Sequence, residues 1–227
     1  MKDLTAIILC GGKGIRLRPL TIDTPKPLIK INNKPILSHV IKHLKSHGIK
    51  QYVIATGYQS HKIKDFMDKN YAEIDYRLID SGDTDILSRV KDCIKNIKTD
   101  ILLCYGDTIS NINLTDLINF HKKNINDVII SSYPIMIPFG VMELNDQGYV
   151  KSFVEKPILK NVMNIGYYYF CKKDFEIIEK NNGIISLLDT LIKSKRLKCY
   201  KHNGIHITIN TLAELENANE NIKKIFK

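Results

Sequence analysis

Three glycines, at positions 11, 12 and 14, follow directly after an apolar segment, Leu4–Leu9. Glycine has no Cβ, so backbone N–H groups in such a loop can approach a phosphate chain closely. Open α/β sheets bind nucleotides at a loop of this kind, beyond the carboxyl end of the first strand. Arg16, two residues after the last glycine, adds a cationic donor. The segment therefore predicts a site for the phosphates of a nucleotide.

Two charged side chains further along the chain could complete this site. Lys26 lies between Pro25 and Pro27, whose rings restrict the backbone on both sides of the ammonium group. Asp107 follows Gly106 at the end of another apolar segment. A carboxylate at the carboxyl end of a central strand can hold Mg²⁺, and a glycine beside it leaves room for a nucleotide. An aspartate in this place is also common as a turn or helix-cap residue.

The composition is typical of a globular α/β protein. The chain has 227 residues, enough to bury a full core, and 44% of them are hydrophobic. No apolar run approaches the ~20 residues of a membrane span, and the N-terminal residues lead into a predicted strand without a cleavable signal pattern. The five cysteines are odd in number and form no C-x-x-C pair. We therefore expect a cytoplasmic protein without a membrane partner.

The formal net charge of +10 raises the question of a nucleic-acid partner. The lysines are scattered along the chain, and no zinc-finger, helix-turn-helix or RNP pattern accompanies them. A lysine-rich solvated surface and a pocket for a polyanionic small molecule account for the charge. We therefore expect no nucleic-acid binding.

Hydrophobic periodicity predicts alternating strands and helices in the first half of the chain. The predicted strands are 4–9, 51–56, 74–79, 100–104 and 127–133, and the predicted helices are about 35–47, 60–69, 86–97 and 114–123. The second half is richer in strands, at 140–144, 149–155, 163–171, 197–201 and 205–209, with helices at 174–180, 184–194 and after 211. This order predicts an α/β fold with a Rossmann-like, mostly parallel central sheet, flanked by helices and followed by a smaller strand-rich region. We expect a single domain over residues 1–227.

Three histidines, His39, His43 and His47, recur at four-residue intervals in the predicted helix 35–47. This spacing is compatible with a metal site. They flank the apolar stripe of the helix, and no carboxylate accompanies them. We therefore expect a solvated helical face there.

The twenty residues from Leu9 to Leu28 read L-C-G-G-K-G-I-R-L-R-P-L-T-I-D-T-P-K-P-L. They resemble the opening of the sugar-phosphate nucleotidyltransferase family, whose usual form is L-A-G-G-x-G-T-R-L-x-P-L-T-x-x-x-P-K-P-L. The chain departs from this form at Cys10 and Ile15. The resemblance implies that Arg16 and Lys26 are catalytic. It also implies that the nucleotide contacts Leu9, Cys10, Gly11, Gly12, Gly14 and Arg16.

A second similarity surrounds Asp107. Cys104–Leu114, followed by Phe120–Asn124, resembles the Y-G-D-G and F-H-K segments of the members that act like glucose-1-phosphate cytidylyltransferase. This implies that Asp107 binds Mg²⁺ as the cofactor and that Gly106 lies against the nucleotide.

The family usually has a second metal-binding aspartate near its end, within W-x-D-I-G-T or W-x-x-M-D-T. This chain has His206–Thr211 at that place, which contains no carboxylate. Thr208 or Asn210 would then supply a neutral second ligand, which binds Mg²⁺ more weakly.

Two further segments resemble the parts of the family that contact the acceptor substrate and the base. Phe153–Pro157 matches the family's F-x-E-K-P, which implies that Lys156 holds the acceptor phosphate; Glu155, Asn164 and Gly140 belong to the same expected acceptor site. These residues divide the chain into a nucleotide-binding half, about 1–135, and an acceptor-binding half, about 136–227.

The segment Asp80–Thr84, followed by Ser88–Lys91, lacks the Q-P-x-G-L-A of many members. It is closer to a shortened form of the segment in members that use CTP. The similarity implies that Asp80, Ser81 and Gly82 read the base edge. The alternative is that this segment only caps the helix that follows.

The family resemblance implies an enzyme that joins CTP to a phosphorylated small molecule and releases pyrophosphate. Within the family, the chain is most similar to members that use L-glutamine phosphate and make CDP-L-glutamine for capsular polysaccharide modification. Transfer to glucose 1-phosphate and guanylyl transfer to heptose 1-phosphate are the alternatives. A non-catalytic, nucleotide-binding regulatory homologue is an alternative of another class, because the second aspartate is missing. Assembly into a homo-oligomer stays open.

Overall fold

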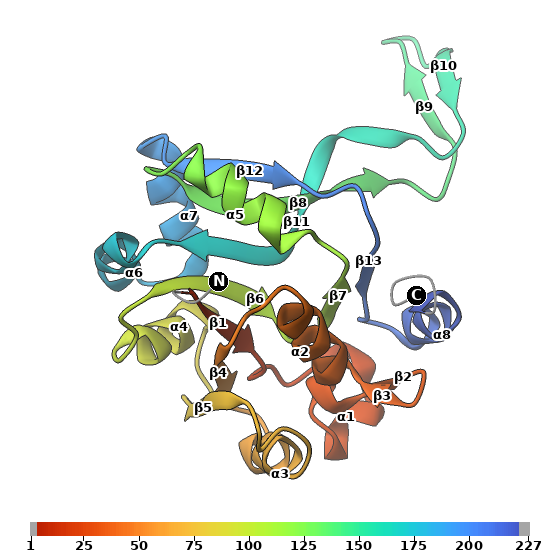
Figure 1. Ribbon diagram of the computed structural model, residues 1–227. Helices are drawn as coiled ribbons and strands as arrows, with labels where there is room; N and C mark the ends of the chain where they lie inside the picture. The colour runs from red at the N-terminus through yellow and green to blue at the C-terminus, as the bar shows by residue number, and fades with distance from the viewer. Residues whose placement is uncertain (1–3, 223–227) are drawn as a thin grey trace.

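A central sheet of seven strands organises the computed structural model, which describes residues 4–222 (Figure 1). The strand order is β12–β8–β11–β6–β1–β4–β5. The strands are β1 (Leu4–Leu9), β4 (Gln51–Thr56), β5 (Asp75–Asp80), β6 (Asp100–Tyr105), β8 (Val128–Met136), β11 (Ile158–Phe170) and β12 (Leu197–Lys201). All neighbours pair in parallel except β11, which is antiparallel to both β6 and β8. Strands from both halves of the chain therefore share one sheet.

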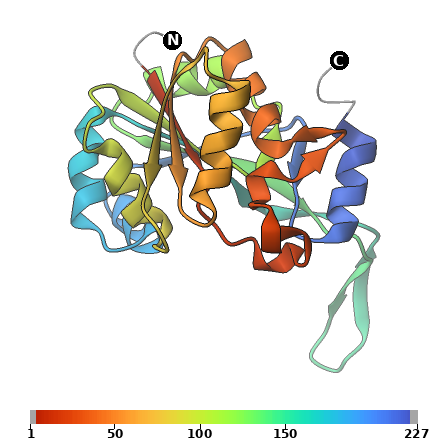
Figure 2. The ribbon, with the colours of Figure 1, turned by 90° about the horizontal axis from the view of Figure 1, so that it is seen from below.

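Helices cover both faces of this sheet, as Figure 2 shows from below. One apolar cluster contains buried side chains of α2 (Ile36–Ser46), α3 (Ser60–Asn70), α5 (Leu114–Lys122) and α8 (Leu212–Asn221). The second cluster contains those of α4 (Ile86–Ile94), α6 (Phe175–Lys180) and α7 (Ile184–Lys193). The expected α/β fold with a mostly parallel sheet between helices is confirmed.

Most predicted elements lie within a few residues of the observed ones, and the differences have physical reasons. β11 begins at Ile158 and not at 163, because its first residues pair with the end of β8 although they are exposed and lack an apolar pattern. β7 (Thr108–Ser110) was not predicted, and it pairs antiparallel with β13 (His206–Thr208). The other short elements are η1 (Ile15–Leu17), α1 (Leu20–Asp23), η2 (Lys26–Leu28), β2 (Lys30–Ile31), β3 (Lys34–Pro35) and η3 (Lys172–Asp174).

A hairpin projects from the body of the protein in both ribbon views (Figures 1 and 2). It consists of β9 (Val141–Leu144) and β10 (Val150–Val154), which form a two-stranded antiparallel sheet. We call residues 136–159, which include the adjoining ends of β8 and β11, the arm. Every residue of β9 and β10 is exposed, so neither face of the hairpin is covered by the rest of the described chain.

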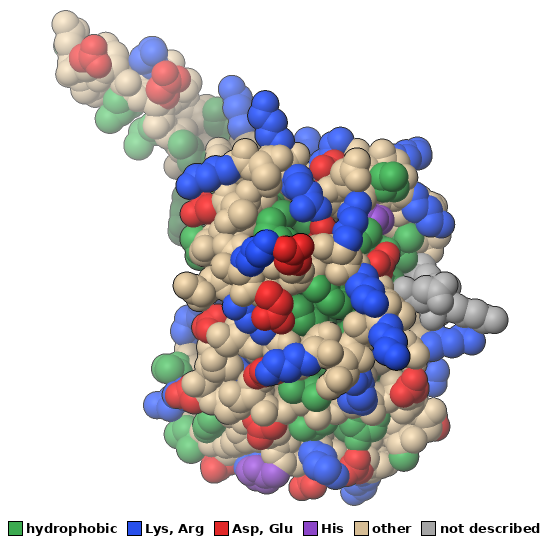
Figure 3. All heavy atoms as spheres, turned by 90° about the vertical axis from the view of Figure 1, so that its left-hand side faces the viewer, with side chains coloured by type: hydrophobic (Ala, Val, Ile, Leu, Met, Phe, Trp, Pro, Cys, Tyr) green, Lys and Arg blue, Asp and Glu red, His purple; other side chains and the backbone are tan. Residues whose placement is uncertain are grey.

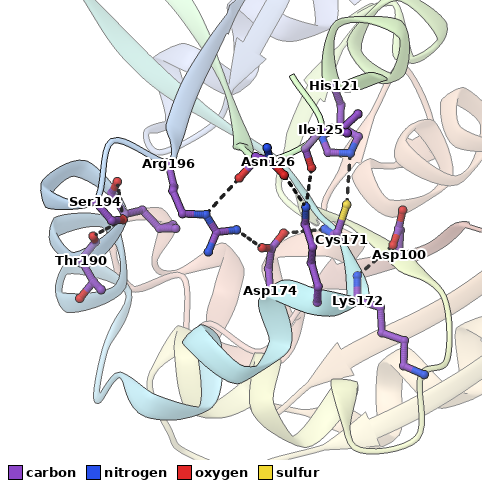
Figure 4. Close-up of polar contacts among 12 residues, drawn as sticks. Asp100, His121, Ile125, Asn126, Cys171, Lys172, Asp174, Thr190, Ser194 and Arg196 are labelled. Atoms are coloured by element: carbon purple, nitrogen blue, oxygen red, sulfur yellow. Dashed lines mark hydrogen bonds and ion pairs between the residues drawn. The ribbon is translucent and has the colours of Figure 1, made fainter. Parts of the chain in front are cut away.

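A buried polar cluster lies at the end of β6 opposite Asp107 (Figure 4). Asp174 is 1% exposed and pairs with the guanidinium of Arg196. Arg196 Nε also donates to the carbonyl of Asn126 at 3.0 Å, and the N–H of Lys172 donates to Asp100 at 2.9 Å. These bonds tie α6 and the end of α7 to the first residue of β6, so their role is structural.

Two observations describe the helices and one face of the surface. Within residues 4–222, none of the helices combines the length and apolarity that crossing a bilayer requires. On the face in Figure 3, lysine and arginine side chains are scattered among acidic ones and form no continuous basic patch.

The expectation of a solvated histidine face on α2 was wrong for two of the three histidines. His39 and His43 are each only 6% exposed. Their flank of α2 is covered because the helix also contacts η2 and β7, in addition to the sheet. His39 Nε2 lies 3.1 Å from the carbonyl oxygen of Ile31. Burial, reinforced by the neighbouring His47 and His202, lowers the pKa of His43 to about 4.

We predict that stability decreases when the pH falls below about 6.5. The pKa of His43 is about 4 in the folded chain, below the ordinary value of 6.5, so the unfolded chain binds more protons between these values. The free energy of unfolding should therefore fall with pH across this window. Urea denaturation at pH 7, 6 and 5 measures it, and His43→Gln should show a smaller slope than the unmodified chain. An equal slope in both proteins would contradict the assignment to His43.

Candidate active site

A cavity of about 280 Å³ opens at the carboxyl ends of β1 and β6, beside the glycine loop. Five of the residues expected to contact the nucleotide line it: Leu9, Cys10, Gly12, Gly14 and Arg16. Gly14 has a φ of 61°, a left-handed conformation that glycine adopts without strain. The chain turns there into η1, which carries the exposed Arg16 beside the cavity.

Lys26, Asp107 and Asn210 meet on the other wall of this cavity. Lys26 Nζ lies 2.5 Å from Asp107 Oδ2 and 3.2 Å from Asn210 Oδ1. The Lys26 side chain is 11% exposed and that of Asp107 is 34% exposed. The pairing of β7 with β13 brings the segments after β6 and after β13 together, although about a hundred residues separate them. Two oxygens from distant segments thus point to one position that holds a cation.

A second cavity, of about 200 Å³, adjoins the first and shares Arg16, Lys26, Asp107 and Asn210 with it. Asn164, an expected acceptor-site residue, also lines this cavity, and its contact with an acceptor stays a prediction. The side chains that line both cavities can therefore reach a ligand in either one.

The side chain of Asn164 also makes two hydrogen bonds within β11. Its Oδ1 accepts the N–H of Gly166 at 2.9 Å, and its Nδ2 donates to the hydroxyl of Tyr168 at 2.5 Å. Gly166 has a φ of 78°, and a Cβ there would lie 2.5 Å from the ring of Tyr105. Asn164 is therefore held rigidly where β11 bends past the second cavity.

Gly106 determines how closely the Asp107 loop approaches β1. Its N–H donates to the carbonyl of Leu9 at 2.9 Å. A Cβ on Gly106 would lie 2.6 Å from the sulfur of Cys10 and 2.7 Å from the Leu9 oxygen, so a larger residue would push Asp107 away. Burial raises the pKa of the Cys10 thiol, which therefore stays uncharged at neutral pH. The floor of the cavity at Cys10 is therefore uncharged. The charged side chains of the site are Arg16, Lys26 and Asp107.

The segment predicted to read the base lies beside the glycine loop. Lys13 Nζ, in that loop, is 2.6 Å from the Asp83 carboxylate. Asp80 Oδ1 accepts the N–H of Gly82 at 3.0 Å, and the N–H of Ser81 donates to the carbonyl of Thr56 at 3.3 Å. These three expected base contacts do not line either cavity, so their role in base reading stays a prediction.

Arg89, in α4, holds this segment in place, and the sequence analysis assigned it no role. It is 5% exposed, and its guanidinium donates to the carbonyls of Thr56, Gly82 and Thr84, the last two at 3.0 and 3.2 Å. These carbonyls belong to the end of β4 and to the expected base-reading segment. The sequence offered one sign of this role: Arg89 lies between the apolar residues Leu87 and Val90 of the predicted helix, which indicates a buried arginine.

Two glycines make room for this guanidinium. A Cβ on Gly11 would clash with Cζ of Arg89, and a Cβ on Gly57 would lie 2.6 Å from its Nη1. Gly11 therefore contributes by letting the glycine loop pack against Arg89, and it does not line the first cavity.

The remaining expected acceptor residues lie elsewhere. Gly140, Glu155 and Lys156 are at the base of the hairpin, and none of them lines either cavity. The N–H of Lys156 donates to the carbonyl of Phe139 at 3.2 Å, and Lys156 has a φ of 47°. Their contact with an acceptor stays a prediction.

The residues present can be tested for a fit to a divalent cation. Asp107 and Asn210 direct two hard oxygen atoms to the position of the Lys26 ammonium, the donor type that Mg²⁺ prefers. Thr208 lines the second cavity, and no contact with Asp107 is seen for it. In the described part of the chain, no three His, Cys, Asp or Glu side chains form a group able to hold a metal ion. A bound Mg²⁺ would thus need most of its ligands from water and substrate.

Comparisons with known proteins cover nearly the whole chain. The model of the nucleotidyl transferase family matches residues 5–222. The probable glucose-1-phosphate cytidylyltransferase of Bacillus subtilis (strain 168) is 29% identical, over 96% of this chain and 95% of that protein. The glucose-1-phosphate cytidylyltransferase of Salmonella typhimurium is also 29% identical, over 93% of each chain. The bifunctional protein GlmU of Methanococcus maripaludis is 36% identical over 84% of this chain, which spans only 46% of that protein.

The crystal structure of HddC from Yersinia pseudotuberculosis has the same fold. It matches with a TM-score of 0.75 and covers 96% of this chain and 99% of that chain. Its sequence identity to this chain is 23%, so the likeness concerns the fold.

We predict that Gly11→Ala destabilises the protein, whereas Gly12→Ala does not. A methyl group added at position 11 would force the buried Arg89 guanidinium away from its carbonyl partners. The expected loss is about 1–3 kcal/mol, the usual cost of overpacking. A Cβ on Gly12 meets nothing within 4 Å, so the matched variant should change stability by less than ~0.5 kcal/mol. Urea denaturation of both variants measures the difference.

Arg89→Ala gives the control for this explanation. With the guanidinium removed, Gly11→Ala should cost much less than it does in the unmodified chain, because contacting sites are not additive. Strictly additive losses would mean that Arg89 is not what restricts position 11.

Proposed function

This chain belongs to the nucleotidyl transferase family, and we propose that it transfers CMP from CTP to a phosphorylated small molecule and releases pyrophosphate. The family assignment makes it a nucleotidyltransferase. The choice of CTP and of the acceptor is our inference from the site and from the relatives.

The meeting of Arg16, Lys26 and Asp107 beside the glycine loop supports this function most directly. The reaction must bring two anionic substrates together, a triphosphate and an acceptor phosphate. Cationic side chains between them reduce their repulsion and stabilise the charge that develops during transfer. Two adjoining cavities that share Arg16 and Lys26 suit a reaction of this kind.

Two observations support cytosine as the base. The relatives from Bacillus subtilis and Salmonella typhimurium are named as cytidylyltransferases, and they match this chain almost from end to end. The segment Asp80–Thr84 lies against the glycine loop through the Lys13–Asp83 pair and the Arg89 bonds. This proximity supports a contact of the segment with the base when the triphosphate occupies the loop.

The proposed mechanism needs no covalent nucleophile and no strong base, because an acceptor phosphate oxygen is already anionic. The attacking oxygen displaces pyrophosphate from the α-phosphorus in line, so the protein contributes positioning and charge stabilisation. Lys26 is buried and held by two partners, which suits a fixed contact. Arg16 is exposed, so its long side chain can follow the charge that moves to the leaving pyrophosphate.

We infer that Mg²⁺ is the cofactor and that Asp107 holds it, with Asn210 as the neutral second ligand. When bound, the ion would neutralise part of the triphosphate charge. Asp107 and Asn210, which contact Lys26 in this structure, would hold the ion, and Lys26 would then be available for a substrate phosphate.

For the acceptor we propose L-glutamine phosphate, because the sequence motifs resemble those of members that use it. Glucose 1-phosphate is the second candidate, and the relatives from Bacillus subtilis and Salmonella typhimurium, which are named for it, favour it. Both present a terminal phosphate group to the shared cations, so the site's charge alone does not separate them. The remaining parts of the second cavity, such as Asn164 and Thr208, must make the distinction.

We predict that CTP with L-glutamine phosphate gives the highest kcat/KM in a matrix of nucleotides and acceptors. The assay measures pyrophosphate release with CTP, UTP, GTP and dTTP against L-glutamine phosphate, glucose 1-phosphate and heptose 1-phosphate. Highest activity with glucose 1-phosphate and CTP would replace the acceptor but keep the base. If no pair of nucleotide and acceptor releases pyrophosphate although CTP binds, the result would favour the regulatory alternative that the missing second aspartate suggests.

We predict that Asp107→Asn lowers kcat by ~100- to 1,000-fold, because a developing charge loses one electrostatic stabiliser. Asn210→Ala should lower it much less, since a neutral oxygen contributes less to a hard cation. A Mg²⁺ titration of the rate should also show a weaker apparent affinity in Asp107→Asn. If that variant keeps the normal rate and Mg²⁺ dependence, the metal is bound elsewhere.

A further inference from the structure

Asn210 lies beyond the end of the strand that brings it to the cation site. β13 ends at Thr208, the last of its residues that pair with β7. The next residue, Ile209, is buried, and the chain then leaves the sheet. Asn210 Oδ1 nevertheless lies 3.2 Å from Lys26 Nζ. A contact outside the sheet is therefore needed to fix the direction of this side chain.

Glu214, in the first turn of α8, makes such a contact. Its Oε2 accepts the N–H of Asn210 at 2.5 Å. Thr211, the N-cap of α8, accepts the N–H of Glu214 at 3.2 Å through its hydroxyl oxygen. The pattern T-x-x-E at 211–214 is that of a capping box, in which the glutamate usually returns to the N–H of the N-cap residue. Here the glutamate reaches one residue further back, to the residue that carries the amide oxygen.

This hydrogen bond restricts where the side chain of Asn210 can point. The peptide unit is planar, so holding the N–H of Asn210 fixes the whole plane that ends at its Cα atom. Only the short side chain remains between that Cα and the amide oxygen. A hydrogen bond to a carboxylate is also roughly twice as strong as one between neutral groups. Glu214 is thus connected to the cation position through one peptide plane and one side chain.

The other end of α8 holds the segment that carries Lys26. Asn219 Oδ1 accepts the N–H of Asn32 at 2.7 Å, in the turn between β2 and β3. This turn follows η2, which contains Lys26. Both ribbon views show α8 beside the β2–β3 hairpin (Figures 1 and 2). The helix therefore joins the two segments whose side chains meet at the Lys26 ammonium group.

A neutral ligand depends on its placement more than a charged one does. Mg²⁺ requires its ligands at about 2.0–2.1 Å in nearly octahedral geometry. An amide oxygen carries no net charge that would attract the ion from further away, so Asn210 contributes only when its oxygen is accurately placed. Groups that orient a metal ligand therefore affect metal affinity although they do not touch the ion.

We propose that Glu214 is a positioning residue for the metal site: by accepting the N–H of Asn210, it directs Asn210 Oδ1 to the ion that Asp107 holds. This role rests on the proposed function, because it needs a metal-bound triphosphate at Asp107. Glu214 itself lines neither of the two active-site cavities, so it acts through Asn210 and not by contact with the ion or a substrate.

Binding of the Mn²⁺–CTP complex tests this role without requiring turnover. Mn²⁺ speeds the relaxation of water protons more strongly when a slowly tumbling protein holds it, so relaxation measured against protein concentration gives the affinity. Loss of a group that orients a metal ligand typically costs ~10- to 100-fold in metal affinity. Because Asn210 is a neutral ligand, we expect the lower value, ~10-fold, for Glu214→Ala. The affinity for metal-free CTP, measured by calorimetry, should not change.

Three further variants separate positioning from a general effect on the structure. Glu214→Gln keeps an oxygen that can accept the same N–H, so it should keep most of the Mn²⁺–CTP affinity. Glu216→Ala removes an exposed glutamate from a different face of the same helix, and it should bind like the unmodified chain. In Asn210→Ala the side chain to be positioned is absent, so adding Glu214→Ala should lower the affinity no further.

Equal affinities in the unmodified chain and in Glu214→Ala would overturn the role of Glu214. A further loss on adding Glu214→Ala to Asn210→Ala would do the same, and so would a loss in Glu216→Ala as large as that in Glu214→Ala. A Glu214→Gln variant as weak as Glu214→Ala would show that the charge is needed and not the hydrogen bond, contrary to the proposal. No binding of Mn²⁺–CTP to the unmodified chain would instead overturn the proposed nucleotide and metal site itself.

Discussion

The ion pair between Lys26 and Asp107 is the contact on which the geometry of this site depends. The ammonium group is nearly buried, and a buried charge without a partner is strongly disfavoured. The pair therefore holds η2 against the loop after β6, and Asn210 adds the segment after β13 to the same contact. Both cavities are built around this point. A place for positive charge thus exists before any substrate arrives.

The elements that surround this pair could be predicted because each is specified by its own residues. β1 and β4 have the predicted bounds, since each contains a run of four apolar residues and a glycine follows within two residues of its end. Arg16 and Lys26, which belong to one motif, and Asp107, which belongs to another, line the same cavity. Rules for local sequence and for the carboxyl ends of parallel strands were enough to bring them together.

What could not be predicted depends on contacts between distant segments. The pairing of β7 with β13 decides where Asn210 lies, and neither strand carries a sign of its partner. Arg89 has a role only because carbonyls of two other segments converge on it. His43 is buried because β7 and His202 cover its side of α2, which the helix pattern alone cannot show. The projection of the arm likewise depends on how β8 and β11 leave the body.

The position of β11 in the sheet affects how the chain folds during its synthesis. The four parallel strands β5, β4, β1 and β6 are complete once residue 105 has been synthesised. The outer edge of β6 then waits for its partner, because Cys104 pairs with Tyr167. At 5–20 residues per second this interval is about 3–13 s. An unpaired strand edge is a template for pairing with other chains, so a nascent chain is most exposed to aggregation during this interval, before residues 167–170 close the edge.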